Sequence, residues 1–427
     1  MSFPRKKSAS LSSTISFQNP FNPIQILFLH FLPMGQSQNL VTTIAVVFFS
    51  VAKAFSNGGS GLLDKCSSDG DCGAGLYCFS CPQGFSGSRC VRSTITDQFQ
   101  LLNNSLPFNK YAFLTTHNSY AIEEEPSHTG VPRMTFTNQE DNVTQQLHNG
   151  VRGLMLDTYD FDGDVWLCHS NGGKCYDFTA FEPAIDTLRE IEAFLSANPE
   201  EIVTIILEDY VGPNGLIKVF NESGLMKYWF PLSNMPKNGE DWPLVSDMVN
   251  NNQRLIVFTS IESKEASEGI AYQWHYMVEN QYGDGGMKAG SCPNRSESAP
   301  LVDKSKSLVL VNYFSTIPMK ETTCVHNSGD LIDMLKTCYG AAGNRWANFV
   351  AVNYYKRSEG GGSFQAVDTL NGMLLCGCDD IHACVGLDTP FGELLPNVEH
   401  SNCVRHISCL KQCHFFSALR FKKKKTS

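Results

Sequence analysis

The stretch YAFLTTHNSYA, residues 111–121, begins with a short apolar run and then becomes polar, with His117 beside Asn118. An apolar run of this length that ends in polar residues is typical of a buried strand. Six further stretches of the chain show a strand pattern. The predicted strands are Tyr111–Thr115, Val151–Asp157, Val165–Cys168, Ile202–Leu207, Arg254–Thr259, Leu308–Tyr313 and Asn348–Asn353.

Helices are predicted between these strands. The clearest lies in TAFEPAIDTLREIEAFLSANP, residues 179–199, where apolar side chains recur on one face. Thr179 and Glu182 predict a capping box at its start, and Pro183 falls within the first turn, which tolerates proline. Further helices are predicted around Gly215–Phe230, Leu244–Asn251 and Asp330–Tyr339.

The alternation of strands and helices implies a parallel sheet and an α/β fold. The number of strands and the length of the segment that holds them predict a distorted TIM-type (β/α) barrel in residues 105–383, complete or incomplete. A doubly wound sheet is the alternative, but no glycine-rich dinucleotide-binding loop follows the first strand.

The charge and cysteine content narrow the class of protein. The 427-residue chain has 33 lysines and arginines against 43 aspartates and glutamates, a net charge of −10. A nucleic-acid-binding surface is normally basic, so nucleic acid is not an expected partner. The 16 cysteines form no repeated array of paired Cys-x2-Cys motifs. Disulfides formed in an oxidising compartment are therefore a better interpretation than zinc binding.

Five of the cysteines lie between Cys66 and Cys90, in a stretch rich in glycine and serine. We expect residues 55–100 to form a small disulfide-rich module with little core of its own. Because five is odd, one cysteine pairs outside the module or stays free. A zinc knuckle is the less favoured alternative, since Cys78-x2-Cys81 lacks a second such pair nearby.

The N-terminal segment, residues 1–54, predicts export from the cell. A short apolar run, Leu40–Ala54, ends in the small-x-small pattern of a signal-peptidase site. Met34 would give this signal an ordinary start, so residues 1–33 are interpreted as an extension of the gene model; an N-terminal membrane anchor is the alternative. Four Asn-x-Ser/Thr sequons agree with a secreted protein: Asn103, Asn142, Asn221 and Asn294.

The C-terminal segment, residues 384–427, shows no barrel element and ends in a basic tail with four consecutive lysines, 422–425. Such lysines are able to attract an anionic membrane, although a solvated tail or an altered reading frame is the simpler interpretation. The segment lacks the apolar tail of a GPI signal, so a GPI anchor is not expected.

Polar side chains follow four of the predicted strands, where a barrel carries its chemistry. His117 and Asn118 follow the first strand, Asp157 ends the second, His169 follows the third and Glu208 follows the fourth. Each residue alone has an ordinary structural explanation, such as a hydrogen bond or an ion pair. Together, two imidazoles suit proton transfer in both directions, and the oxygen ligands suit Ca²⁺ or Mg²⁺. This set predicts metal-assisted displacement at phosphorus.

Three stretches resemble the X region of phosphoinositide-specific phospholipases C: FLTTHNSY (113–120), GVRGLMLDTYDFDGDVWLCHS (150–170) and EIVTIILEDY (201–210). The chain is most similar to plant secreted proteins with a PI-PLC X domain, which also carry an N-terminal cysteine cluster. The resemblance covers residues 66–380. It implies a distorted TIM barrel that cleaves a phosphodiester by attack of an internal hydroxyl, in phosphatidylinositol the inositol 2-hydroxyl, with diacylglycerol as the leaving group.

The resemblance also implies roles for five residues. His117 corresponds to the histidine that stabilises the developing phosphorane or assists the attacking hydroxyl. His169 corresponds to the general acid for the leaving oxygen. Asn118, Asp157 and Glu208 correspond to three calcium ligands of the eukaryotic enzymes.

Met155 departs from the family pattern, because those enzymes have a glutamate, the fourth calcium ligand, at its position. A thioether is a poor ligand for a hard cation, so the site loses one negative charge. The metal-free bacterial members have an arginine where Asp157 stands, and this chain has none there. A divalent cation at a weakened site, Ca²⁺ before Mg²⁺, therefore remains the expected cofactor.

Other residues near the predicted strand ends are candidates for binding the substrate, with a surface role or ordinary barrel packing as the structural alternative. A disulfide between Cys168 and Cys175 would close the loop beside His169. The candidate substrate-binding residues are Lys174, Asn312, Tyr313, Asn353 and Tyr355.

The sequence therefore predicts a secreted phosphoric diester hydrolase of the phospholipase C type, acting on a phosphoinositide or another phosphodiester. Peripheral contact with a membrane is compatible with this function. Two alternatives stay open. One is hydrolysis of glycerophosphodiesters or cell-surface phosphodiesters, and the other is a catalytically impaired barrel that binds a ligand, for which Met155 is the main argument.

Overall fold

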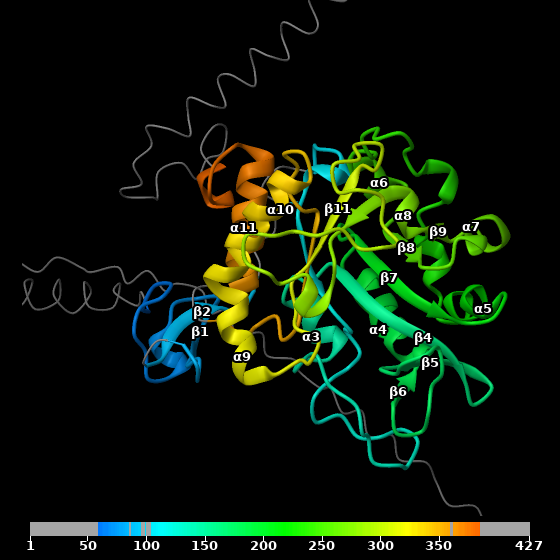
Figure 1. Cartoon of the computed structure of the whole chain (residues 1–427), viewed down its shortest axis with the longest axis horizontal. Helices are drawn as coiled ribbons and strands as arrows, with labels where there is room; N and C mark the ends of the chain where they lie inside the picture. The colour runs from blue at the N-terminus through cyan, green and yellow to red at the C-terminus, as the bar shows by residue number, and fades with distance from the viewer. Residues whose placement is uncertain (1–58, 85–86, 95–98, 100–103, 359–361, 385–427) are drawn as a thin grey trace, which may run out of the picture. The chain divides into compact units, whose positions relative to one another are not determined.

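A curled sheet of parallel strands forms the centre of the fold. The computed structural model describes residues 59–84, 87–94, 99, 104–358 and 362–384, and its parallel strands run in the order β10-β11-β12-β3-β4-β7-β8-β9 (Figure 1). Within this described part, no pairing joins β9 to β10, so the barrel is incomplete. The strands are β3 (Phe113–Thr116), β4 (Gly153–Phe161), β7 (Val203–Tyr210), β8 (Leu255–Thr259), β9 (Ala271–Tyr272), β10 (Met277–Glu279), β11 (Leu308–Asn312) and β12 (Phe349–Val352).

The strands are buried on both faces, which explains their almost continuous apolar sequences. Successive side chains point to opposite faces of a strand. In β12, Phe349 and Ala351 pack with Phe113 in one apolar cluster, whereas Val350 and Val352 belong to the cluster that includes the helices. The sheet therefore has an inner apolar face and an outer face covered by helices.

The helices cover the outer face of the sheet with their apolar sides. Leu188 and Ile191 of α4, Leu335 of α10 and Leu370 of α11 belong to the outer cluster. The α-helices are α3 (Val143–His148), α4 (Ala184–Ala197), α5 (Gly215–Glu222), α6 (Val245–Asn250), α7 (Ser263–Glu268), α8 (Gln273–Tyr276), α9 (Lys320–Val325), α10 (Leu331–Ala341) and α11 (Gly362–Leu375). Short 3₁₀ segments lie at Asp69–Asp71, Phe108–Lys110, Leu225–Tyr228, Leu232–Asn234, Gly283–Gly285 and Ile381–Cys384, and a π-helical turn at His326–Asp330.

The predicted barrel is thus confirmed, and all seven predicted strands are present with boundaries shifted by a few residues. One of them has a different role. The strand β5 (Asp164–Cys168) runs antiparallel to β4 and also pairs with β6 (Ala180–Pro183), so it is not a barrel strand. The two-residue turn at Asp162 and Gly163, both with positive φ, folds β5 directly back along β4.

The predicted capping box at Thr179 and Glu182 is wrong. Residues 180–183 form β6, and α4 begins only at Ala184, with no side-chain hydrogen bond at its N-cap. Pairing with β5 satisfies the backbone of this segment, which removes the need for a helical first turn. The Thr179 hydroxyl bonds to the backbone of Tyr176, and the Glu182 carboxylate accepts a short hydrogen bond from Thr187.

The N-terminal cysteine-rich module contains the antiparallel pair β1 (Leu76–Phe79) and β2 (Arg89–Arg92). Two disulfides, Cys66–Cys78 and Cys72–Cys90, lie within it, and a third joins Cys81 to Cys324 of α9. The prediction that an odd cysteine pairs outside the module is confirmed. The zinc knuckle is wrong, because Cys78 and Cys81 both form disulfides.

Polar contacts also fix the module to the barrel. Arg92 of β2 forms an ion pair of 2.5 Å with the buried carboxylate of Asp368 on α11. The Tyr77 hydroxyl donates to the backbone oxygen of Lys356 at 2.6 Å, and the Arg357 guanidinium lies over the Phe79 ring. Lys356 and Arg357 belong to the segment that follows β12, so the module packs against one of the loops at the strand ends.

The predicted signal segment, the sequon at Asn103 and the basic tail after residue 384 lie outside the described residues. Among the helices that the structure describes, none has both the length and the apolar character needed to cross a bilayer.

Replacing both Cys81 and Cys324 by serine should lower the free energy of unfolding by about 2–4 kcal/mol, because this disulfide joins residues far apart in the sequence. Urea denaturation followed by circular dichroism measures the change. A loss below about 0.5 kcal/mol would show that the noncovalent contacts alone hold the module in place.

Candidate active site

A cavity of about 240 Å³ lies at the carboxyl ends of the barrel strands. Its walls include both predicted histidines, the three predicted metal ligands and Met155. They also include Asn312, one of the five predicted substrate-binding residues. The residues in question are His117, Asn118, Met155, Asp157, His169, Glu208 and Asn312.

The other four candidate substrate-binding residues do not line this cavity. Lys174 is exposed on the loop after His169. Tyr313 belongs to the outer apolar cluster, and the Tyr355 hydroxyl is buried in contact with Asp141. Asn353 is also buried, but it contacts His117 and therefore acts on the site through that ring.

His117 directly follows β3, and a hydrogen bond at Nδ1 fixes the orientation of its ring. Its Nδ1–H donates to Oδ1 of Asn353 at 2.9 Å, and Asn138 donates to the same oxygen at 2.9 Å. The ring stacks on Phe314 with centroids 3.7 Å apart. Burial lowers the pKa of His117 to about 3, although the hydrogen bond that His117 donates to Asn353 acts in the opposite direction. His117 is therefore neutral near pH 7, with Nε2 as its free ring nitrogen.

His169 follows β5 and is held by the segment that follows β3. Its Nδ1–H donates to the backbone oxygen of Phe136 at 2.8 Å, and the Thr135 hydroxyl donates to the backbone oxygen of His169 at 2.7 Å. Burial lowers the pKa of His169, while the hydrogen bond to Phe136 and the charge of Glu208 favour the protonated form. As in His117, Nε2 is the free nitrogen.

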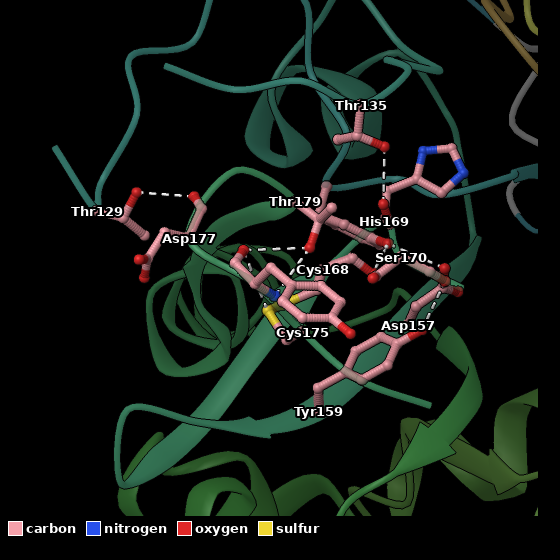
Figure 2. Close-up of a disulfide and its surroundings, with 12 residues drawn as sticks. Thr129, Thr135, Asp157, Tyr159, Cys168, His169, Ser170, Cys175, Asp177 and Thr179 are labelled. Carbon is pink, nitrogen blue, oxygen red and sulfur yellow. Dashed lines mark hydrogen bonds between the residues drawn. A yellow bond between two sulfur atoms is a disulfide. The ribbon is translucent and has the colours of Figure 1, made fainter. Parts of the chain in front are cut away.

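The predicted disulfide between Cys168 and Cys175 is present and closes the loop next to His169 (Figure 2). The same loop bonds to the segment that follows β3, because the Thr129 hydroxyl donates to the backbone oxygen of Asp177 at 2.8 Å. The position of His169 is thus restrained from both sides.

Asp157 is buried, with 8% of its surface exposed, and accepts a hydrogen bond from the Tyr120 hydroxyl at 3.0 Å. The same hydroxyl lies 2.8 Å from the backbone oxygen of Cys168. Burial raises the pKa of Asp157, and the nearby Glu208 carboxylate raises it further. Tyr120 therefore connects the carboxylate on β4 with the residue before His169.

Glu208 and Asp209 point to opposite faces of β7. Glu208 lines the cavity and accepts a hydrogen bond from Tyr210 at 2.5 Å. Asp209 is buried behind the sheet, where it pairs with the Lys264 ammonium at 2.9 Å and with the Thr259 hydroxyl at 2.6 Å. Of the two acidic residues, Glu208 is the one that reaches the cavity.

The cavity offers three oxygen donors to a hard cation. Asn118 has a positive φ of 44°, which asparagine tolerates better than most residues. Its Oδ1 is buried and has no hydrogen-bond partner among the described residues, and the carboxylates of Asp157 and Glu208 line the same cavity. An amide oxygen and two carboxylates match the ligands that Ca²⁺ prefers. The thioether of Met155 adds no such ligand, so the residues fit a cation held by three protein groups.

Arg295 is a cavity residue that the sequence analysis missed. It follows β10, and its guanidinium lies 3.1 Å from the buried Glu279 carboxylate and over the rings of Trp274 and Tyr282. Burial alone would lower the pKa of Arg295, but the carboxylates of Glu279 and Glu297 raise it, so the side chain stays charged. No motif marked it, because its place in the cavity depends on the fold of a long loop.

Asn138 is a second missed residue. Its side chain bonds to Asn353 and lies 3.2 Å from Nδ1 of His117 and 3.4 Å from the Asn118 amide. It belongs to a segment without regular secondary structure, where a buried asparagine leaves no periodic pattern in the sequence.

Comparison with known proteins identifies the family of the chain. The family model described as PI-PLC X matches residues 106–371. A PI-PLC X domain-containing protein of Arabidopsis thaliana is 56% identical over 343 residues, which cover 80% of each chain. An uncharacterized secreted protein of Arthroderma benhamiae is 25% identical over 297 residues, covering 63% of this chain and 65% of that one.

Among solved structures, the chain is similar to the phosphatidylinositol-specific phospholipase C from Listeria monocytogenes. The TM-score is 0.43 at 12% sequence identity, and the similarity covers 64% of this chain and 97% of the bacterial one. The family follows from the sequence matches alone: the chain belongs to the PI-PLC X domain family.

The buried neutral state of His117 predicts a pH-dependent contribution to stability. The unfolded chain takes up a proton at this residue below its ordinary pKa of 6.5, whereas the folded chain does so only near pH 3. Stability is therefore unaffected above pH 6.5 and is lost as the pH falls below it. Replacement of His117 by glutamine should remove this loss of unfolding free energy, which amounts to about 1 kcal/mol per pH unit.

The measurement is urea denaturation of the wild type and His117→Gln at pH 7 and at pH 5. The free energy of unfolding of the variant should increase relative to that of the wild type as the pH falls. A difference between the two proteins that stays the same at both pH values would mean that folding does not lower the pKa of His117.

Proposed function

We propose that the protein is a phosphoric diester hydrolase of the phospholipase C type. The observation that carries the proposal is the pair of histidines on one cavity wall, each with Nδ1 engaged and Nε2 free. A proton can be taken up at one ring and given at the other, as displacement at phosphorus by a hydroxyl group requires.

His117 is the proton acceptor in this mechanism. Because it is neutral, its Nε2 lone pair takes the proton from the attacking hydroxyl of the substrate while the new P–O bond forms. His169 acts as the acid and has to carry a proton for this step; burial lowers its pKa, and the Phe136 carbonyl and the charge of Glu208 oppose that lowering. It donates its proton to the leaving oxygen as the second P–O bond breaks. The products are a cyclic phosphodiester and a free alcohol.

The charge of the phosphodiester needs a positive partner in the cavity. A divalent cation held by Asn118, Asp157 and Glu208 would supply such charge to the phosphate oxygens. Arg295 supplies a second positive charge from this chain itself. Its bonds to Glu279 and its contacts with two aromatic rings hold the guanidinium in place before the substrate binds.

A lipid such as phosphatidylinositol is the substrate class that the cavity rim supports best. Four apolar side chains near His169 are exposed, and Met134 is 79% exposed. The Tyr176 and Phe178 rings stack on one another, and the backbone of Met134 bonds to that of Phe178. These side chains provide a surface for peripheral contact with a membrane. The exposed residues are Met134, Phe136, Tyr176 and Phe178.

Secretion is part of the same proposal. The described residues contain six disulfides, namely Cys66–Cys78, Cys72–Cys90, Cys81–Cys324, Cys168–Cys175, Cys292–Cys338 and Cys376–Cys384. Bonds of this kind form and persist in oxidising compartments, which supports an extracellular location.

The decisive experiment measures cleavage of phosphatidylinositol in vesicles by the purified protein, with calcium and with a chelator. His169→Ala should lose at least about 100-fold in kcat, because the leaving oxygen no longer receives a proton. Lys174→Ala, which removes an exposed side chain outside the cavity, serves as the control and should keep its rate within about twofold.

Each outcome has a different meaning. A calcium-dependent rate that His169→Ala abolishes supports the three-ligand cation site despite Met155. A rate that survives the chelator but not the mutation assigns the positive charge to Arg295. If no turnover occurs, glycerophosphodiesters are tested next. Inactivity on these as well would contradict the proposal and favour a ligand-binding barrel.

Arg295→Lys tests the role of the arginine while it keeps a positive charge next to Glu279. Because lysine cannot reproduce the planar fork of donors, kcat/KM should fall about 10-fold or more with a smaller change in thermal stability. Glu297→Gln is the matched control, since it removes the exposed partner of Arg295 and keeps the cavity side unchanged. Equal losses in both variants would contradict a direct contact between Arg295 and the substrate.

A further inference from the structure

The segment between β3 and α3 forms hydrogen bonds to both histidines of the cavity. We define residues 121–139 as the strap. Its Phe136 carbonyl accepts from His169, and its Asn138 and Gln139 side chains contact the ring and the backbone of His117. The conformation of the strap therefore decides how both imidazoles are oriented.

A cluster of three potential metal ligands lies at the other end of the strap. Glu125 and His128 come from the strap, and Glu182 comes from β6. One ligand atom of each lies within 4.8 Å of the others. None of the three lines the cavity, so the cluster is separate from the cation site at Asn118 and Asp157.

The two carboxylates of the cluster have few hydrogen-bond partners, although only Glu182 is buried and Glu125 is half-buried. Among the residues that the structure describes, the Oε2 atom of Glu125 is shielded from solvent and has no hydrogen-bond partner. Glu182 is only 6% exposed, and among the described residues the Thr187 hydroxyl is its one hydrogen-bond donor. Burial raises the pKa of Glu182 to about 7. Buried carboxylates of this kind normally have a donor or a cation at each oxygen.

Arg133 is the positive side chain nearest to this cluster, but it is engaged elsewhere. Its guanidinium lies 4.0 Å above the Phe181 ring and donates to the backbone oxygens of Ile122 and Pro126. The charges of Glu125 and Glu182 act on it at longer range. Within the described residues it forms no ion pair with either carboxylate.

We propose that Glu125, His128 and Glu182 form a binding site for a divalent transition-metal cation, with Zn²⁺ as the best fit. One imidazole nitrogen and two carboxylate oxygens are a set that Zn²⁺ takes, and water completes a tetrahedron. Zinc–ligand distances of about 2.0–2.2 Å place any two ligand atoms within about 4.4 Å of each other. Because the three ligand atoms lie within 4.8 Å of one another, binding draws them closer together, and the exposed His128 side chain is free to move toward the carboxylates.

The bound cation connects the strap with β6. The strap orients His117 and His169, so the cation restrains both histidines from a position outside the cavity. The binding itself does not rest on the proposed hydrolase activity, because it is measured without any substrate.

The test is a calorimetric titration of the tag-free full-length protein with ZnCl₂ after dialysis against a chelator. We expect one zinc ion per chain and a higher thermal midpoint when zinc is present. His128→Asn, at an exposed position that should not affect folding, should weaken the zinc Kd at least about 10-fold. Glu182→Gln should do the same. Glu124→Gln, a change at the exposed neighbouring residue, should leave the Kd unchanged.

A double variant, His117→Gln with His169→Gln, separates this site from the cavity and should still bind zinc. The proposal is overturned if zinc does not bind stoichiometrically, if His128→Asn binds as tightly as the wild type, or if the double variant loses the zinc. A magnesium titration supports the proposal when binding is much weaker, because an imidazole ligand favours Zn²⁺ over Mg²⁺.

Discussion

The pairing of β4 with its neighbours is the constraint on which the site depends. Parallel pairing with β7 places Asp157 directly beside Glu208, and antiparallel pairing with β5 places Thr158 opposite Leu167. His169 comes two residues after Leu167, directly after the end of β5, so it lies at the same level of the barrel. A one-residue slip in either register would turn one of these groups away from the cavity.

Hydrogen bonds to Nδ1 give the two histidines the same tautomer through different partners. His117 uses the amide of Asn353, and His169 uses a backbone carbonyl of the strap. Both arrangements leave Nε2 free. Burial lowers the pKa of both histidines, but the charges around them differ, because Glu208 favours protonation of His169, whereas His169 and Arg295 disfavour protonation of His117. This difference supports the proposal that His117 accepts a proton and His169 donates one.

The sequence predicted the barrel well because each strand carries its own apolar pattern. It predicted six of the residues that line the cavity because these stand at or just beyond the ends of apolar runs in the sequence. It failed where pairing overrides local pattern: residues 180–183 look like the start of a helix, yet they complete a small antiparallel sheet with β5. It also treated β5 as a barrel strand, since a strand's direction leaves no trace in its own sequence.

The sequence by itself determined the strand segments and marked two histidines, three oxygen-bearing side chains and Met155 as the residues to compare at the predicted site. Those features are local, because they depend on residue type and short spacing. Only the tertiary structure decided that Arg295 and Asn312 line the same cavity, that Asn138 and Asn353 hold His117, and that Cys81 pairs with Cys324. These contacts join residues far apart in the chain, and no short-range pattern encodes where a long loop will fold.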